Sequence, residues 1–303
     1  MSAVAAIVSP TPPQRLALAR EADAADWLAG LPALVDTMLA RWELTAERVA
    51  EPGGRTSMTV LVRCADGERA ALKLCAPGTS AVLEEAALRR WDGLGAVRVL
   101  RSLPEAGALL LERLHGETSL RSLPEAKAML EAVSAVRRLW VDPGPGDVFP
   151  SVAERTGHAV PALRAAVAGE AGPLAEEALR LRAELVADAR ERLLLHGDFR
   201  QGAVLASDAG RSPWLAVGPE PVTGERAYDL ARLVRDRLHD LVASPGAAAV
   251  TRRRVKRLAD SVEVDPERLR GWTLFRAVES GVRNLAAGRR TEGELLLECA
   301  GWL

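Results

Sequence analysis

The chain has 303 residues, of which 48% are apolar, and its 40 Lys and Arg residues nearly balance 41 Asp and Glu residues. The formal net charge of −1 excludes a generally basic nucleic-acid-binding protein, and no apolar run reaches the roughly 18 residues of a membrane span. The three cysteines are odd in number and widely spaced, and the N-terminus lacks a secretory signal pattern, so we expect reduced thiols in a cytoplasmic protein.

The first part of the chain is predicted to hold helices followed by antiparallel strands. Apolar residues at helical spacing over 13–41 predict one or two amphipathic helices. A Pro-Gly-Gly break then introduces a run of short apolar segments separated by turn residues. This texture predicts strands at 58–62, 70–74, 97–101 and 108–112, with a helix at 83–91 between the second and third.

The rest of the chain is predicted to be mainly helical. Helical periods cover 119–140, 160–192 and 226–301, with a Pro/Gly-rich linker at 141–150 and a short β island at 193–217. These sequence patterns divide the chain into an N-terminal helical segment (1–48), a β-rich N-lobe (49–112) and a helical C-lobe with a hairpin (113–303). The layout indicates an α+β protein, and a kinase-like arrangement is one form of that class.

The string LLLHGDFRQGAVLAS (193–207) places Asp198 on a polar loop between two apolar runs. A carboxylate held in this way could orient a hydroxyl and accept its proton during phosphoryl transfer, although an ordinary turn fits the string equally well. The string resembles the H-G-D-x-x-x-x-N catalytic loop of aminoglycoside phosphotransferases. The resemblance implies a two-lobed protein-kinase-like fold with His196 and Asp198 as catalytic residues, and Ala203 stands where the family has asparagine.

A second string, WLAVGPEPVTGERAYDL (214–230), resembles the streptomycin and hydroxyurea phosphotransferase branch of that family. The resemblance places Gly218 where the magnesium-binding aspartate would stand and Glu220 where the family has a lysine. It also implies that Asp229 caps the following helix and braces the catalytic loop.

A third group of residues suggests where a nucleotide would bind. Gly53, Gly54 and Ser57 fall in a glycine-rich turn, which alone is more often a simple hairpin. Lys73, one of only three lysines, alternates with apolar residues on the next strand, and an exposed strand lysine is its ordinary interpretation. The family resemblance implies a phosphate-contacting lysine paired with Glu84, with Glu85 as a rival. It also implies a hinge where backbone groups near Glu112 and Leu114 meet an adenine.

The departures at Ala203 and Gly218 make magnesium binding doubtful. Losing metal stabilisation worth several kcal/mol should cost on the order of three decades in rate, unless Glu220, two residues along the same strand face, substitutes. The first hypothesis is therefore a catalytically degenerate member of secondary metabolism whose ligand-binding cleft takes a nucleotide, small molecule or peptide, with a biosynthetic partner protein. The alternative is an active ATP- or GTP-dependent phosphotransferase that protects against an aminoglycoside or nucleoside antibiotic. Neither hypothesis involves nucleic acid or a membrane.

Overall fold

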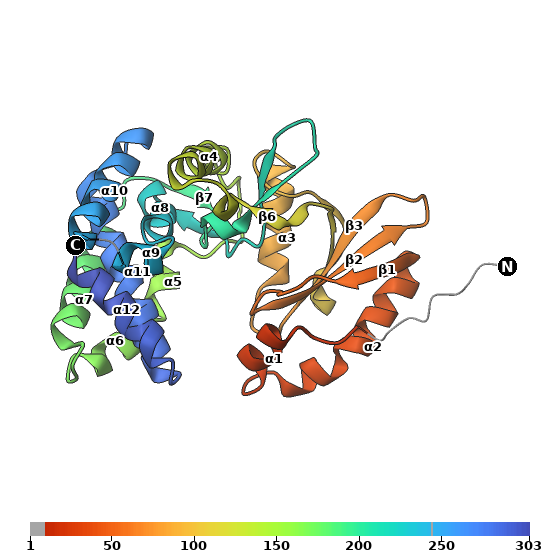
Figure 1. Cartoon of the computed structure of the whole chain (residues 1–303), viewed down its shortest axis with the longest axis horizontal. Helices are drawn as coiled ribbons and strands as arrows, with labels where there is room; N and C mark the ends of the chain where they lie inside the picture. The colour runs from red at the N-terminus through yellow and green to blue at the C-terminus, as the bar shows by residue number, and fades with distance from the viewer. Residues whose placement is uncertain (1–9, 244) are drawn as a thin grey trace. The chain divides into compact units, whose positions relative to one another are not determined.

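The computed structural model describes residues 10–243 and 245–303, which form two compact units (Figure 1). The first unit contains the described residues up to Ser119 together with Leu205–Val217, and the second contains Leu120–Val204 and the described residues from Gly218 to Leu303. Within the described ranges, no helix is both long enough and apolar enough to cross a bilayer.

The first unit is built on a five-stranded antiparallel sheet with the strand order β1-β2-β3-β5-β4. Alternate residues of β2 and β3, such as Val60 and Leu72, are buried on one face, as the period of two requires. The turn between these strands contains Gly67 at φ +90°. The strands are β1 (Leu44–Val49), β2 (Ser57–Cys64), β3 (Arg69–Cys75), β4 (Val99–Leu103) and β5 (Ala108–Glu112).

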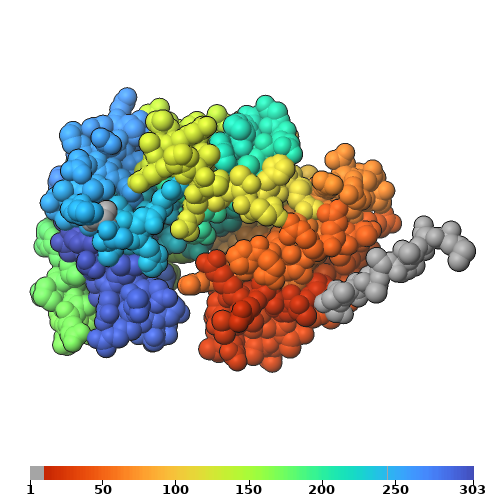
Figure 2. Space-filling model, viewed as in Figure 1, coloured from red at the N-terminus to blue at the C-terminus, as the bar shows by residue number. Residues whose placement is uncertain are grey.

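Two helices cover the apolar face of this sheet (Figures 1 and 2). They are α1 (Gln14–Arg20) and α2 (Ala25–Trp42), and α2 contributes Leu31, Val35 and Met38 to the core that the strands share. The helices were predicted, but the structure differs from the division of the chain near residue 49. Helix α2 ends at Trp42, and the next residue, Glu43, has a φ of 54° that turns the backbone into β1, so the described residues 10–48 do not form a separate helical segment.

Helix α3 (Ala81–Trp91) confirms the predicted helix, and the side chain of Ser80 caps its N-terminus. A smaller sheet of β6 (His115–Ser119), β8 (Val204–Ala206) and β9 (Trp214–Ala216) follows. The backbone of Val97 donates to Ala216, which ties β9 to the first unit. For this reason the stretch 205–217 does not belong with the helical part, where the sequence had placed it. The short helices η1 (Pro104–Ala106), η2 (Leu120–Ser122) and η3 (Gln201–Ala203) connect these elements.

The second unit is mainly helical, with one antiparallel pair of strands, β7 (Leu193–Leu195) and β10 (Val222–Gly224). Its core surrounds α11, which buries Trp272 and Phe275. The predicted helix over 119–140 is shorter because Pro124 precedes its first turn, and the helix over 160–192 is divided in two. The helices are α4 (Glu125–Arg137), α5 (Val152–Gly157), α6 (Val160–Ala166), α7 (Gly172–Ala187), α8 (Arg226–Val234), α9 (Leu238–Val242), α10 (Ala247–Val262), α11 (Pro266–Ala286) and α12 (Arg290–Gly301).

Candidate functional site

An ion pair joins the middle of the five-stranded sheet to α3. The Nζ atom of Lys73 lies 2.6 Å from each carboxylate oxygen of Glu84, and the two side chains are only 13% and 6% exposed. The residues on either side of Lys73 are fully buried in the core of the opposite face, so strand alternation directs the ammonium toward α3. The predicted pairing with Glu84 is confirmed, and the rival Glu85 pairs with Arg89 instead.

The predicted phosphate-covering residues lie at the turn between β1 and β2. Gly53 has a φ of +70°, and an added Cβ would come within 2.9 Å of the Pro13 side chain. The turn itself therefore requires glycine at this position. Gly54 is not in the left-handed region, and Ser57 begins β2 opposite Cys75. The turn is confirmed, and the contact of Gly53, Gly54 and Ser57 with a phosphate stays a prediction.

The predicted hinge follows the end of β5. The backbone N–H of Glu112 donates to the carbonyl oxygen of Arg98 over 3.1 Å. The Glu112 carboxylate accepts from the Arg98 N–H over 2.8 Å and pairs with Arg211. An adenine could not use the N–H or the carboxylate of Glu112 without displacing their partners, and the contact of backbone groups near Glu112 and Leu114 with an adenine stays a prediction.

The catalytic-loop string follows β7 directly and is held by a buried carboxylate on α8. Asp229 is fully buried, and it accepts the backbone N–H groups of His196 and Gly197 over 2.9 and 2.8 Å. The predicted bracing role of Asp229 is confirmed, although the N-cap position of α8 belongs to Glu225. Gly197 has a φ of +78°, and an added Cβ would lie 1.9 Å from the Glu220 carbonyl oxygen. Only glycine therefore fits this turn.

His196 was predicted to be catalytic, but its side chain has no exposed surface. Its ring packs edge-on against Phe199, with 5.6 Å between the ring centres. A fully buried ring cannot touch a dissolved substrate, so the geometry favours a positioning role for His196 within the loop.

Two arginines hold the carboxylate of Asp198. Its Oδ1 lies 2.7 Å from Arg232 Nε in an ion pair, and its Oδ2 accepts a hydrogen bond from Arg200 Nε over 3.1 Å. Burial raises the pKa of this carboxyl, but the guanidiniums of Arg232 and Arg200 outweigh burial and hold the pKa below its usual range. Because a general base works best with a pKa near the operating pH, this pairing makes Asp198 a weak proton acceptor.

The residues near Asp198 do not fit magnesium, the metal that the family resemblance implies. Mg²⁺ requires oxygen ligands in octahedral geometry, and neither Ala203 nor Gly218 has a side-chain oxygen. The carboxylate of Glu220, the predicted substitute, is paired with Arg155. Throughout 10–243 and 245–303, no three His, Cys, Asp or Glu side chains gather in a way that could hold a metal ion.

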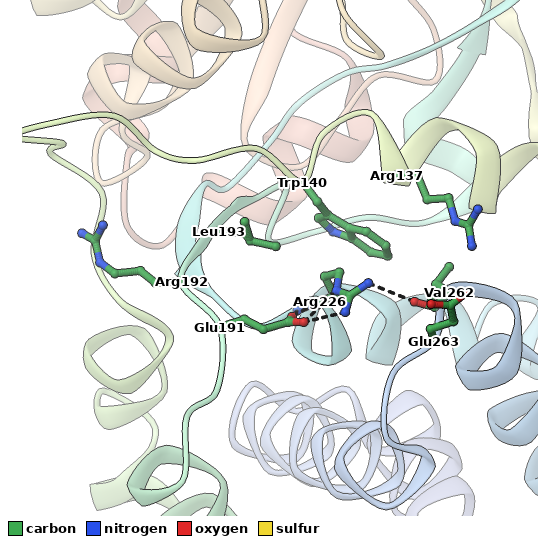
Figure 3. A pocket seen from close by; sticks show the side chains of 8 residues that line it. All are labelled: Arg137, Trp140, Glu191, Arg192, Leu193, Arg226, Val262 and Glu263. Atoms are coloured by element: carbon green, nitrogen blue, oxygen red, sulfur yellow. Dashed lines mark hydrogen bonds and ion pairs between the residues drawn. The ribbon is translucent and has the colours of Figure 1, made fainter.

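A hollow of about 700 Å³ also lies in the helical unit (Figure 3). On its wall the guanidinium of Arg226 lies 5.8 Å from the centre of the Trp140 ring and pairs with Glu191. Trp140 Nε1 donates to Asp229 over 3.2 Å. The wall of this hollow therefore shares one carboxylate with the catalytic-loop backbone.

Sequence reasoning did not single out Arg200 or Arg232 as site residues. Arginine accounts for all but three of the 40 basic residues, so no single arginine is conspicuous. One signal was present, because the helical period places Arg232 almost one turn after Asp229.

The sheet with its lysine–glutamate pair and the helical unit with its H-G-D loop define a kinase-like fold. Choline kinase LicA from Streptococcus pneumoniae has this fold, with a TM-score of 0.61 at 13% identity over 89% of this chain and 97% of that structure. The Plasmodium vivax ethanolamine kinase gives a TM-score of 0.59 at 12% identity over 89% and 84% of the two chains. These similarities confirm the predicted fold class.

The chain belongs to the aminoglycoside/hydroxyurea antibiotic resistance kinase family, whose model matches residues 41–288. It is 36% identical to the streptomycin 6-kinase of Streptomyces glaucescens over 273 residues, covering 86% of this chain and 85% of the relative. It is 37% identical to the hydroxyurea phosphotransferase of Kitasatospora aureofaciens over 266 residues, covering 84% and 73%. The predicted family is thereby confirmed.

Proposed function

We propose that this chain is a family member that binds a small-molecule ligand but has lost metal-dependent phosphoryl transfer. The observation that carries the proposal is the surroundings of Asp198. Both of its carboxylate oxygens are occupied by guanidiniums, while Ala203 and Gly218 supply no oxygen for a metal. An acceptor hydroxyl would thus find the Asp198 carboxylate already paired with two guanidiniums and unable to accept its proton readily. The transferred phosphoryl group would have no magnesium to stabilise its charge.

The pair of Lys73 and Glu84 supports retained binding of a nucleotide, either ATP or GTP. In kinases such a pair holds the ammonium in place for the phosphates, and keeping two charges at 13% and 6% exposure is costly unless they are paired. We also propose a peptide as the alternative ligand, and a biosynthetic partner protein with which the chain acts in secondary metabolism.

The alternative is an active phosphotransferase that acts on an alcohol of an aminoglycoside or nucleoside compound. Two observations favour it. Lys73, Glu84 and Asp198 are all present, and similar proteins carry the names streptomycin 6-kinase and hydroxyurea phosphotransferase. This alternative requires Glu220 to leave Arg155 and ligate a metal.

The two functions are separated by a transfer assay with ATP or GTP, magnesium, and streptomycin or hydroxyurea as acceptor. We expect a rate at least about three decades below that of a family relative measured in parallel, since metal stabilisation of the transferred group is absent. The Asp198→Asn variant should then leave the residual rate unchanged. Turnover equal to that of the relative, abolished by Asp198→Asn, would establish the active enzyme instead.

A further inference from the structure

Four arginines gather near Asp198 within the helical unit. Arg200 follows it on the loop, Arg232 and Arg235 lie at the end of α8, and Arg276 lies on α11. Arg276 is 7% exposed and donates to the carbonyl oxygens of Gly197 and Tyr228, so its charge is held against the loop backbone. Asp198 is the one carboxylate in direct contact with any of the four in the described parts of the chain.

Arg235 is the member whose burial is hardest to explain. Its side chain is buried at 7% residue exposure, and its Nη2 donates to Ser280 Oγ over 3.0 Å. Its Nε has no hydrogen-bond partner, and none of the described carboxylates lies within 4.0 Å of the guanidinium. Burial lowers the pKa of Arg235 to about 9, with the nearby Arg232 and Arg276 adding to the effect. The group remains charged at neutral pH, and a buried cation without an anion is unfavourable.

The outer edge of the cluster is open to solvent. The side chains of Arg200 and Arg232 are 39% and 30% exposed, and the contact of each with Asp198 is made by its Nε. Among the described residues, the Nη groups of these two arginines donate to no protein acceptor. The nearby carboxylates of Asp229 and Asp236 accept backbone N–H groups of the loop. The cluster therefore offers unused guanidinium donors at its solvent-exposed edge, while Asp229, Asp236 and Glu279 balance part of its charge from a distance.

We infer that Arg200 and Arg232 form a metal-independent binding site for a phosphate group, with Arg235 and Arg276 adding positive charge behind them. The planar guanidinium fork matches phosphate oxygens and stays charged at all physiological pH values. The anion would reduce the repulsion among the four guanidiniums. The guanidiniums would in turn neutralise the phosphate charge, which magnesium does in a metal-dependent kinase. This inference rests on the proposed loss of the metal site and specifies its ligand as a phosphorylated compound, either a nucleotide or a phosphorylated small molecule.

Isothermal titration with inorganic phosphate, at constant ionic strength set by chloride and with EDTA present, tests the site. We expect saturable binding without metal, weakened about tenfold or more by Arg200→Gln or by Arg232→Gln, because each removes charge-assisted hydrogen bonds. The matched control is Arg290→Gln, which removes the same charge from a 75% exposed side chain on α12. ATP and a sugar phosphate titrated in parallel distinguish the two sources of the phosphate group.

Arg235→Met provides a readout that a purely structural role would not give. Removing a buried, unpaired charge should raise the melting temperature of the free protein, while the further rise caused by phosphate should shrink. The inference is overturned if phosphate does not bind in EDTA, or if Arg200→Gln and Arg232→Gln bind it as tightly as the unmodified chain. Binding that appears only with magnesium would overturn the proposed function as well. Absent phosphate binding together with metal-independent ADP binding would overturn this inference alone.

Discussion

Arg232 Nε lies 2.7 Å from the Oδ1 of Asp198 in an ion pair that links helix α8 to the loop with the H-G-D string. Together with Arg200, this contact occupies both oxygens of the carboxylate. An aspartate that would orient a hydroxyl and accept its proton thereby acts as the counter-ion of two guanidiniums.

The first prediction concerns the stability of Asp198→Asn. If the carboxylate is a counter-ion, its removal leaves two partly buried guanidiniums unpaired and should lower the free energy of unfolding by about 1–3 kcal/mol. Urea unfolding followed by circular dichroism measures this change. A catalytic carboxylate held under strain behaves oppositely, since its removal is neutral or stabilising. An unchanged or higher stability would therefore count against the counter-ion role.

The second prediction concerns the pair of Lys73 and Glu84. Replacing either partner alone, as Lys73→Met or Glu84→Leu, should cost about 3–5 kcal/mol because the other charge is left buried. The double variant should recover a large part of this loss. The exposed pair Arg180–Glu184 is a matched control, and its coupling should be about 0.3–0.5 kcal/mol. Additive single effects at Lys73 and Glu84 would show that the two side chains do not interact.

The third prediction uses Cys75, whose Sγ lies 3.8 Å from a Glu84 oxygen. Burial raises the pKa of this thiol to about 11, and Glu84 contributes to the rise while Lys73 opposes it. Because the thiolate is the reactive form, Cys75 should resist iodoacetamide at pH 8 in the folded protein.

The variant Glu84→Gln removes one cause of the raised pKa and leaves the ammonium of Lys73 nearby, so it should speed the alkylation of Cys75. Peptide mass mapping after timed quenching assigns the reaction to each cysteine. Cys299, whose pKa burial also raises to about 11, is the internal control and should not change. Equal alkylation of Cys75 in both proteins would contradict the predicted influence of Glu84.

Much of the fold could be predicted because apolar residues recur with the period of a strand or of a helix along the sequence. Alternation around Lys73 predicted both β3 and the direction of the ammonium, and helical spacing predicted α2 and α3. Strand β1 was missed since its residues, LTAERV, include good helix formers and only half of the strand is apolar. Pairing with β2, a tertiary contact, decides its conformation.

The sequence predicted the site residues that belong to a motif. It did not predict the partners that tertiary packing brings to them. The H-G-D string located Asp198 and its neighbours along the chain. One partner of Asp198, Arg200, is two residues away on the same loop. The other, Arg232, comes from α8, more than thirty residues away in the sequence, and nothing in an arginine-rich composition marks either of them. The same holds for Glu220, whose pairing with Arg155 depends on how α5 lies next to β10.

The fourth prediction concerns Asp229, which braces the loop. Its carboxylate accepts three hydrogen bonds, from the backbone of His196 and Gly197 and from Trp140. Asp229→Asn places an N–H₂ group against at least one of these donors, so we expect a loss of about 2–4 kcal/mol in the free energy of unfolding. Asp208→Asn, at a side chain that is 91% exposed, is the control. A similar effect for both variants would remove the bracing role.

The central claim is that this chain binds its ligand without magnesium, and ADP titration by calorimetry with magnesium or with EDTA tests it most directly. We predict affinities that agree within about twofold in the two buffers, since Ala203 and Gly218 offer no ligand to the metal. The double variant Ala203→Asn with Gly218→Asp should make binding metal-dependent, and aspartate is among the residues best tolerated at the φ of 63° found at Gly218. Binding by the unmodified chain that tightens tenfold or more with magnesium, and loses this gain in Glu220→Gln, would contradict the account.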